Sequence, residues 1–166
     1  LFLASRKVAS AVDWCKTLKG EGDAVGKLVE KGKSAFAGPE ILGKTLGVIG
    51  LGAIGTLVAE GAKALGMDIV GYNPKLSEER IADLTSKGVK LMSSLDELYA
   101  ASDYITLHLP LNDSTRGMIN GEAIAKMKDG VRILNFARGE LVDSDALIAA
   151  LGSGKAAAYV TDFPTD

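Results

Sequence analysis

Three glycines at a fixed spacing, Gly50, Gly52 and Gly55, follow a short apolar run and open a stretch with a helical pattern. Strand, glycine turn and helix, in that order, are the context in which a G-x-G-x-x-G spacing has structural meaning. The first glycine permits a tight turn, the second lets a ligand approach the backbone, and the third lets helix and strand pack closely. Unpaired N–H groups at the helix start, here at Ala53 and Ile54, attract phosphate. The spacing therefore predicts a binding site for the pyrophosphate of a dinucleotide.

From Thr45 onward, apolar and β-branched runs alternate with helical patterns. The runs predict strands at residues 45–49, 68–72, 90–91, 104–107, 131–134 and 157–161. The segments between them predict helices at residues 53–65, 78–87, 95–100, 121–126 and 144–153. Six strands with five intervening helices favour a parallel, doubly wound sheet covered on both faces. We therefore predict a Rossmann-type α/β domain over residues 40–166.

Residues 1–39 have a different pattern. Apolar residues at helical spacing predict one amphipathic helix over residues 1–18. The stretch at residues 20–39 is rich in Gly and Lys and predicts an irregular arm with at most a short helix. Because so long a connection is uncommon inside a compact domain, we expect the arm to wrap a partner subunit.

Composition excludes several classes of protein. The 166 residues are 47% hydrophobic and 24% charged, with a net charge of −2 and no basic stripe, so nucleic acid and anionic membranes are not expected partners. No apolar run reaches the roughly 18 residues that a membrane span needs. The single cysteine, Cys15, rules out an internal disulfide and fits a reducing, cytoplasmic location.

A polar residue, Asn73, ends the second predicted strand 18 positions after Gly55, between Tyr72 and Pro74. That spacing is close to the ~20 residues expected for the residue that contacts the adenosine ribose. An aspartate there would accept from both ribose hydroxyls and repel a 2′-phosphate, whereas asparagine keeps one acceptor and gains a donor. We expect weaker discrimination against NADP but still favour NAD, because no arginine adjoins Asn73 in the sequence.

A second set of candidate residues follows the strand predicted at residues 131–134. Arg138 lies at its carboxyl end, where open α/β sheets bind ligands, and its guanidinium could grip a carboxylate and polarise a carbonyl. The alternative is a structural arginine paired with a nearby acid. Asp143 or Ser144 is expected to be the N-cap of the next helix.

Residues 50–55, 107–110 and 135–143 together resemble the D-isomer-specific 2-hydroxyacid dehydrogenases, and residues 102–111 and 126–130 extend the match. The resemblance implies NAD as cofactor and a small 2-hydroxy acid as substrate, with 3-phosphoglycerate of serine biosynthesis favoured. It implies that Arg138 is catalytic, binding the substrate carboxylate and carbonyl near the nicotinamide. It also implies cofactor contacts from Leu109, Pro110, Thr115, Phe136, Ala137 and Asp162.

The resemblance further implies a two-domain enzyme in which this chain is the inserted nucleotide-binding domain. The family's catalytic Glu would then fall just beyond Asp166 and its acid–base His further on, so this chain should bind cofactor without turning over substrate. His108, the only histidine, precedes the cofactor-contacting Leu-Pro pair and is expected to be structural. A homodimer formed through residues 1–39, with Trp14 in the interface, is also implied.

Other functions remain open at this point. Glyoxylate or hydroxypyruvate reductases and D-lactate dehydrogenases belong to the same family and are poorly separated by this sequence. Transcriptional corepressors of the same fold bind peptides and dimerise in response to NAD. A Rossmann domain without cofactor is disfavoured, because three glycines at this spacing destabilise a helix start that has nothing to bind.

Overall fold

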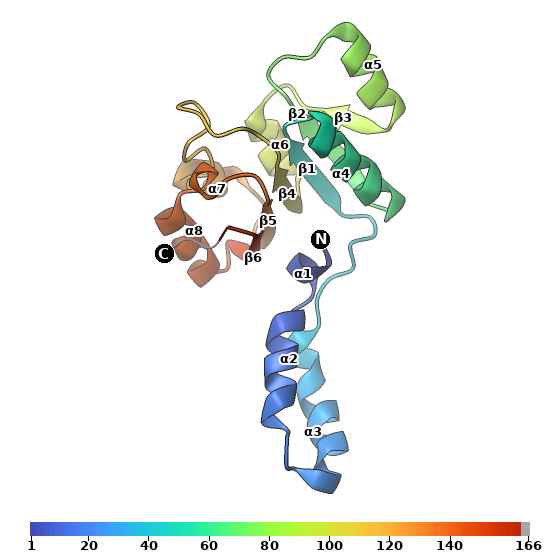
Figure 1. The fold of residues 1–166 in the computed structure, drawn as a ribbon, viewed down its shortest axis with the longest axis vertical. Helices are drawn as coiled ribbons and strands as arrows, with labels where there is room; N and C mark the ends of the chain where they lie inside the picture. The colour runs from blue at the N-terminus through green and yellow to red at the C-terminus, as the bar shows by residue number, and fades with distance from the viewer. Residues whose placement is uncertain (164–166) are drawn as a thin grey trace. The chain divides into compact units, whose positions relative to one another are not determined.

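The computed structural model describes residues 1–163 and divides the chain into two compact units, residues 1–40 and the part that begins at Ile41 (Figure 1). In the described part of the chain, no helix is both long and apolar enough to cross a membrane.

The second unit is built on a six-stranded sheet in the order β3-β2-β1-β4-β5-β6, and all neighbouring strands are parallel. Its strands are β1 (Thr45–Ile49), β2 (Asp68–Tyr72), β3 (Val89–Leu91), β4 (Tyr104–Leu107), β5 (Val131–Asn135) and β6 (Ala156–Thr161). The predicted doubly wound α/β fold is thus confirmed. The strand order reverses between β1 and β4, which makes that junction the expected ligand crevice.

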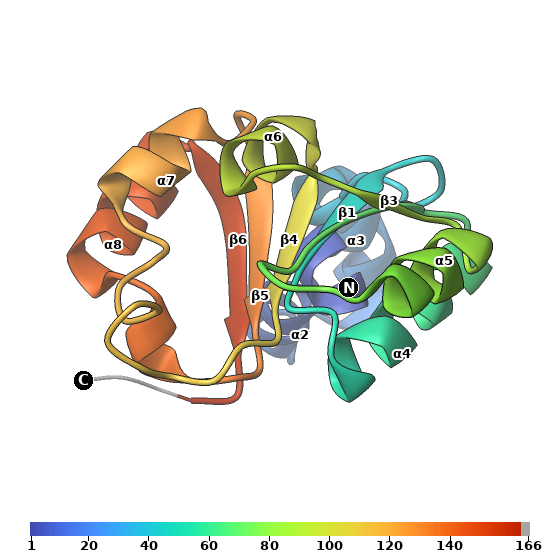
Figure 2. The same ribbon diagram turned by 90° about the horizontal axis from the view of Figure 1, so that it is seen from above.

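Helices cover both faces of this sheet, with α4 and α5 on one side and α6, α7 and α8 on the other (Figure 2). They are α4 (Ala53–Ala64), α5 (Glu78–Ser86), α6 (Leu95–Ala101), α7 (Gly121–Lys126) and α8 (Ser144–Ser153), with a 3₁₀ turn at Gly139–Leu141. Each agrees with the sequence prediction to within one residue at either end. Asp143 is the N-cap of α8, as one of the two predicted candidates, because its Oδ1 accepts from the Ala146 N–H at 3.0 Å.

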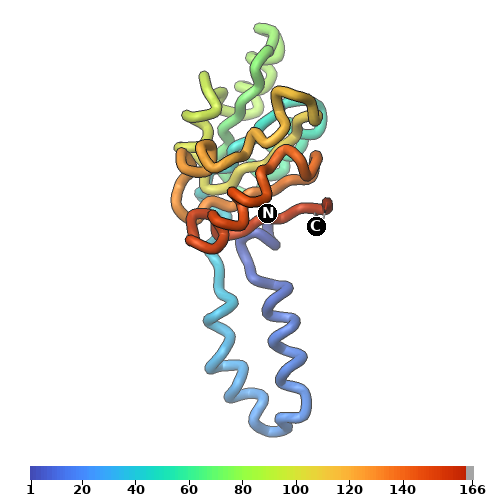
Figure 3. The backbone as a smooth tube through the Cα atoms, turned by 90° about the vertical axis from the view of Figure 1, so that its left-hand side faces the viewer, coloured from blue at the N-terminus to red at the C-terminus, as the bar shows by residue number. Residues whose placement is uncertain are grey.

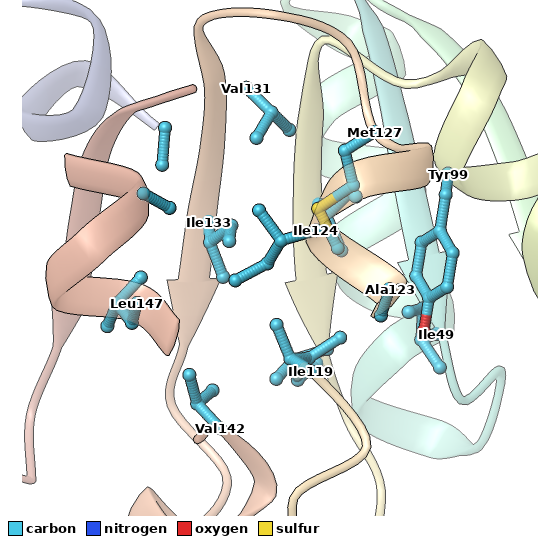
Figure 4. Close-up of a cluster of buried hydrophobic side chains, with 14 of the residues drawn as sticks. Ile49, Tyr99, Ile119, Ala123, Ile124, Met127, Val131, Ile133, Val142 and Leu147 are labelled. Carbon is cyan, nitrogen blue, oxygen red and sulfur yellow. The ribbon is translucent and has the colours of Figure 1, made fainter. Parts of the chain in front are cut away.

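The main hydrophobic core lies between the sheet and helices α6, α7 and α8 (Figure 4). Ile49, Ile105 and Ile133 point from three adjacent strands into this layer and are at most 1% exposed. Burial of these branched side chains on both faces explains why the strands read as continuous apolar runs rather than alternating ones. The core fixes the strand ends from which the candidate site is built.

The first unit differs from its prediction. The expected single helix over residues 1–18 is wrong, since α1 (Phe2–Ser5) and α2 (Val8–Thr17) are separated by Arg6 in an extended conformation. Contacts with the returning chain explain the break: Arg6 Nη1 donates to the Gly38 carbonyl oxygen at 3.0 Å. A Cβ on Gly38 would lie 1.7 Å from the Ser5 carbonyl oxygen, so the two backbones touch at this point.

The predicted irregular arm is mostly helical. It contains a 3₁₀ turn at Gly22–Ala24, helix α3 (Val25–Gly32) and a second 3₁₀ turn at Lys33–Phe36, and it runs back beside α2 (Figure 3). Helix α3 contains the apolar residues Val25, Leu28 and Val29. Trp14 packs on Phe36 with ring centroids 5.1 Å apart, which places the indole against its own unit.

Candidate cofactor-binding site

The glycine turn and the segment after β4 meet at the carboxyl ends of the two central strands. Gly50 directly follows β1, and a Cβ on it would lie 2.4 Å from the His108 carbonyl oxygen and 2.9 Å from Cδ2 of Leu109. The turn and the β4 loop are therefore in backbone contact. This contact lies at the reversal of strand order, where dinucleotides bind in sheets of this topology.

The three glycines differ in conformation and in surroundings. Gly50 has φ +94°, a left-handed conformation that favours glycine. A Cβ on Gly55 would lie 1.9 Å from the Gly50 carbonyl oxygen, so only glycine lets α4 sit this close to the turn. A Cβ on Gly52 would meet nothing within 4 Å. Gly52 therefore faces open space, as a position approached by a ligand requires.

The start of helix α4 is suited to an anion. Gly52 is its N-cap and supplies no side chain to the helix, and the first backbone bond runs from the Thr56 N–H to the Gly52 carbonyl oxygen. Ala53 and Ile54 are exposed, so their N–H groups stand at an open helix terminus. Uncapped N–H groups and the positive end of the helix dipole together favour a bound phosphate.

The end of β2 is tied to the glycine turn. Oδ1 of Asn73 accepts from the Leu51 N–H at 3.2 Å, and its Nδ2 donates to the Lys75 carbonyl oxygen at 2.8 Å. The Tyr72 carbonyl oxygen accepts from the Gly50 N–H at 3.0 Å, and Pro74 is exposed. The predicted ribose contact thus lies beside the predicted pyrophosphate site, with its amide orientation fixed by two hydrogen bonds.

The loop after β4 is closed by the hydroxyl of Thr115. Its Oγ1 donates to the Pro110 carbonyl oxygen at 2.8 Å and accepts from the Asn112 N–H at 2.9 Å. Pro110 itself is exposed. These contacts therefore give Thr115 a structural role in shaping the loop. A contact between Thr115 and the pyrophosphate stays a prediction.

His108 is half-buried behind the glycine turn. Its Nε2 is hydrogen-bonded to Oγ1 of Thr106 at 3.0 Å, and burial lowers its pKa below the ordinary value of 6.5. The ring is therefore neutral at pH 7, packed beside a strand and bonded to a buried hydroxyl. These contacts agree with the expected structural role.

The lowered pKa of His108 predicts a pH-dependent contribution to stability. Because the folded state favours the neutral ring, the unfolded chain binds the extra proton more readily. The contribution is present above pH 6.5 and is lost as the pH falls toward the pKa of the folded state. Urea unfolding between about pH 7.5 and pH 5 should show a smaller loss of stability for His108→Gln than for the parent chain. Equal losses in the two proteins would contradict the shift.

A buried amide shapes the segment after β5. Asn135 has no exposed surface; its Nδ2 donates to the Arg138 carbonyl oxygen at 2.8 Å and to Tyr159 Oη at 3.2 Å. Its Oδ1 accepts from the Ala137 N–H at 3.2 Å. The turn formed in this way leaves Phe136 49% exposed at the same edge of the sheet as the glycine turn.

Arg138 is exposed, and its guanidinium makes two contacts in the described part of the chain. Its Nη1 donates to the Ala137 carbonyl oxygen at 2.7 Å, and the guanidinium lies over the Phe163 ring, 5.8 Å from the centroid. No ion pair joins Arg138 to an acid within residues 1–163, so the alternative of a structural salt bridge finds no support there. Asp162, which directly follows β6, is exposed.

Sequence reasoning missed three residues that the structure brings to this site. Asn135 begins the motif at residues 135–143 but was not among the predicted site residues, although a polar residue that ends an apolar strand signals a buried hydrogen-bonding role. Arg80 and Thr56 are joined by a 2.6 Å hydrogen bond beside the glycine turn. Since 24 residues separate these two, no local pattern could have paired them.

Residues 1–166 match the sequence profile described as "D-isomer specific 2-hydroxyacid dehydrogenase, NAD binding domain". The chain belongs to this family. NAD is therefore its cofactor, and the open Gly52 with the uncapped start of α4 fits the pyrophosphate of that molecule. The resemblance drawn from the motifs is confirmed at the level of the family.

Individual relatives agree with this membership. D-3-phosphoglycerate dehydrogenase of Methanocaldococcus jannaschii is 48% identical over 130 residues, which are 78% of this chain and 24% of the relative. Hydroxypyruvate reductase of Thermotoga maritima is 49% identical over 139 residues, 81% of this chain and 43% of the relative. The chain thus matches less than half of the length of each of these two relatives.

Solved structures of family members share the fold. D-lactate dehydrogenase from Aquifex aeolicus, complexed with NAD and lactic acid, is 43% identical with a TM-score of 0.75, covering 90% of this chain and 43% of that one. The holo form of Rhodotorula graminis D-mandelate dehydrogenase is 32% identical with a TM-score of 0.82, covering 96% and 45%. The NAD complex supports the assignment of the cofactor.

Proposed function

We propose that the whole protein is a D-3-phosphoglycerate dehydrogenase, which oxidises 3-phosphoglycerate to 3-phosphohydroxypyruvate with NAD at the start of serine synthesis. The observation that carries the dehydrogenase assignment is the open glycine turn at the sheet edge from which the exposed Arg138 also projects. The choice of substrate is supported by dehydrogenases of that name from M. jannaschii and Mycobacterium tuberculosis, at 48% and 50% identity.

In this proposal, the residues of the chain hold and orient the reactants. Gly52, Ala53 and Ile54 offer N–H groups to the pyrophosphate, and Asn73 offers its amide to the adenosine ribose. Arg138 binds the carboxylate of the substrate in a bidentate manner, and its positive charge polarises the carbonyl that forms at C2. Bound NAD supplies the acceptor for the hydride.

A second candidate, hydroxypyruvate reductase, is favoured by the 49% identity to the Thermotoga maritima protein of that name. The two reactions have the same hydride chemistry and the same carboxylate next to the reacting carbon. They differ in the phosphate at the far end of the substrate. Neither the glycine turn nor Arg138 distinguishes a phosphorylated from an unphosphorylated substrate.

Two measurements test the proposal. Calorimetric titration of this chain with NAD, NADH and NADP tests cofactor binding, and micromolar affinity for NADH is the expected result. Turnover by the whole protein with 3-phosphoglycerate and NAD, compared with hydroxypyruvate and NADH, then separates the two substrates. A much higher kcat/KM for hydroxypyruvate would overturn the first candidate and leave the second.

Asn73→Asp should tighten NAD binding and weaken NADP binding. The carboxylate can still accept from the Leu51 N–H and loses the bond that the amide donates to the Lys75 carbonyl oxygen. Its second oxygen then turns away from that carbonyl, becomes an acceptor for the ribose hydroxyls and repels a 2′-phosphate. We expect the ratio of the two dissociation constants to change by about tenfold, which corresponds to roughly 1.4 kcal/mol. Parallel titrations with NADH and NADPH measure this ratio, and an unchanged ratio would show that the residue does not face the ribose.

We also propose that residues 1–39 form part of a homodimer interface. Val8 and Val12 are 47% and 52% exposed on α2 and line a groove of about 880 Å³ together with Ala11 and Phe36. A second copy of the chain is the proposed occupant of this groove, whose lining also includes four basic side chains. Sedimentation at micromolar concentration should report a dimer for the parent chain and a monomer for Val12→Glu, whereas a monomeric parent would contradict the proposal.

A further inference from the structure

We propose that Arg80 is a positioning residue for the glycine turn: by holding the Leu51 carbonyl oxygen, it aims the Gly52 N–H at the pyrophosphate of the cofactor. The inference rests on the cofactor site of the proposed function. It assigns a role to a charged side chain of α5, which follows β2.

Neighbouring residues contact the side chain, the N–H and the carbonyl oxygen of Leu51. Its side chain is 2% exposed and lies over Gly71 of β2, where a Cβ would come within 2.8 Å of Leu51 Cδ1. Its N–H donates to Oδ1 of Asn73 at 3.2 Å, and its carbonyl oxygen accepts from Nη2 of Arg80 at 3.3 Å. The central residue of the glycine turn is thus anchored by its side chain, its donor and its acceptor.

The direction of one peptide plane follows from this anchoring. Peptide bonds within residues 1–163 are trans, so the carbonyl of Leu51 and the N–H of Gly52 point in opposite directions across a single rigid plane. Because Arg80 binds the carbonyl oxygen on the α5 side, the Gly52 N–H is directed away from α5. Gly52 is exposed and faces open space, which is where the pyrophosphate is expected.

Thr56 extends the same arrangement into α4. Nη2 of Arg80 donates to its Oγ1 at 2.6 Å, and that hydroxyl donates in turn to the Gly52 carbonyl oxygen at 2.8 Å. Arg80 and Thr56 therefore hold the carbonyl groups of both Leu51 and Gly52. A charged donor at the head of this chain strengthens each bond that follows it.

The sequence of α5 places Arg80 for this task. Ser77 is the N-cap of the helix, and its Oγ accepts from the Arg80 N–H at 3.2 Å, which sets the first turn. Nη1 of Arg80 also forms an ion pair with Asp83 one turn later. In the guanidinium, Nη1 thus bonds within α5, whereas Nη2 bonds to the glycine turn and to α4.

The test compares Arg80→Met, which removes the donors but keeps an aliphatic chain, with Arg80→Lys and Thr56→Val. Each variant is titrated with NADH and ADP, which carry a pyrophosphate, and with adenosine, which does not. A misdirected Gly52 N–H weakens only the first two, whereas an unfolded site weakens all three. Arg80→Met should raise the dissociation constants of NADH and ADP by about tenfold and leave that of adenosine within about twofold. Arg80→Lys should recover part of the loss.

A double-mutant cycle and a matched control sharpen this result. Thr56→Val should weaken NADH binding by a similar factor, and the double variant should lose little more than either single variant, because both residues act through one chain of bonds. Asp83→Asn is the control, since it removes the ion pair on the same helix but leaves the bonds to the turn. It should bind NADH as the parent does.

Hydrogen exchange of the Leu51 amide supplies a readout that needs no cofactor. Arg80→Met should speed that exchange by about tenfold, because Leu51 then lacks the hydrogen bond to its carbonyl oxygen and opens more often. Unchanged exchange and affinity in Arg80→Met, or an equal loss in Asp83→Asn, would overturn the positioning role. Failure of the parent chain to bind NADH would instead overturn the proposed function, while the exchange result would still decide the role of Arg80.

Discussion

Gly55→Ala is expected to lower the free energy of unfolding by about 3 kcal/mol or more and to abolish measurable NADH binding. The added methyl would lie 1.9 Å from the Gly50 carbonyl oxygen, and neither backbone can move without separating α4 from the turn. Urea unfolding and calorimetric titration measure the two effects. A variant with parent-like stability would show that α4 can shift away from the turn at little cost.

Gly52→Ala is the matched comparison, because its methyl group meets nothing within 4 Å of the protein. Its φ of −73° suits any residue, so the free energy of unfolding should stay within about 1 kcal/mol of the parent value. The methyl would project into the space that the pyrophosphate needs, and the dissociation constant of NADH should rise by at least about tenfold. Stability and binding should therefore separate in this pair of variants.

Asn135→Ala is expected to lower the free energy of unfolding by about 3 kcal/mol, because the three hydrogen bonds of this buried amide are lost at about 1 kcal/mol each. The groups affected are the Ala137 N–H, the Arg138 carbonyl oxygen and Tyr159 Oη. Loss of this turn also frees the backbone that carries Arg138. In the whole protein, kcat/KM should then fall by at least about 100-fold.

Tyr159→Phe is the control for that variant. It removes a single partner of Asn135 and leaves the bonds to the Ala137 N–H and the Arg138 carbonyl oxygen, so it should cost only about 1 kcal/mol and spare turnover. Urea unfolding and steady-state kinetics cover both variants. If Asn135→Ala kept the parent kcat/KM, the buried amide would have no part in placing Arg138.

The fold was largely predictable from the sequence because its strands and helices are specified locally. Apolar runs buried on both faces, such as residues 104–107, have no other stable place than the middle of a covered sheet. The glycine spacing then fixed where the first turn lies. The predicted helix starts agreed closely with the structure, because residues whose side chain caps a helix, such as Ser77 and Asp143, mark where the helix begins.

The first unit was predicted less well because its structure depends on contacts between distant residues. The periodicity of residues 1–18 is helical throughout, yet Arg6 leaves the helix to reach Gly38, 32 residues away. The arm is likewise stabilised where Trp14 packs on Phe36, and no sequence pattern around either residue predicts that contact. Tertiary contacts overrode the local pattern in both places.

The same distinction holds for the candidate site. Residues recognised by spacing, such as Gly52 and Asn73, lie where the sequence predicted, at the edge of the sheet. The supporting bonds of Arg80 to the glycine turn join positions 29 residues apart, and only the folded chain brings them together. Short motifs thus predict the residues of a candidate site more readily than the residues that support them from other elements.

The division of the chain into two units also separates its fluorophores. The single tryptophan, Trp14, lies in the first unit, whereas all four tyrosines lie in the second. Excitation at the red edge of the absorption band therefore reports on residues 1–40, and tyrosine emission reports on the sheet that carries the cofactor site. Two optical signals from one sample can thus show whether the two units melt together or one before the other.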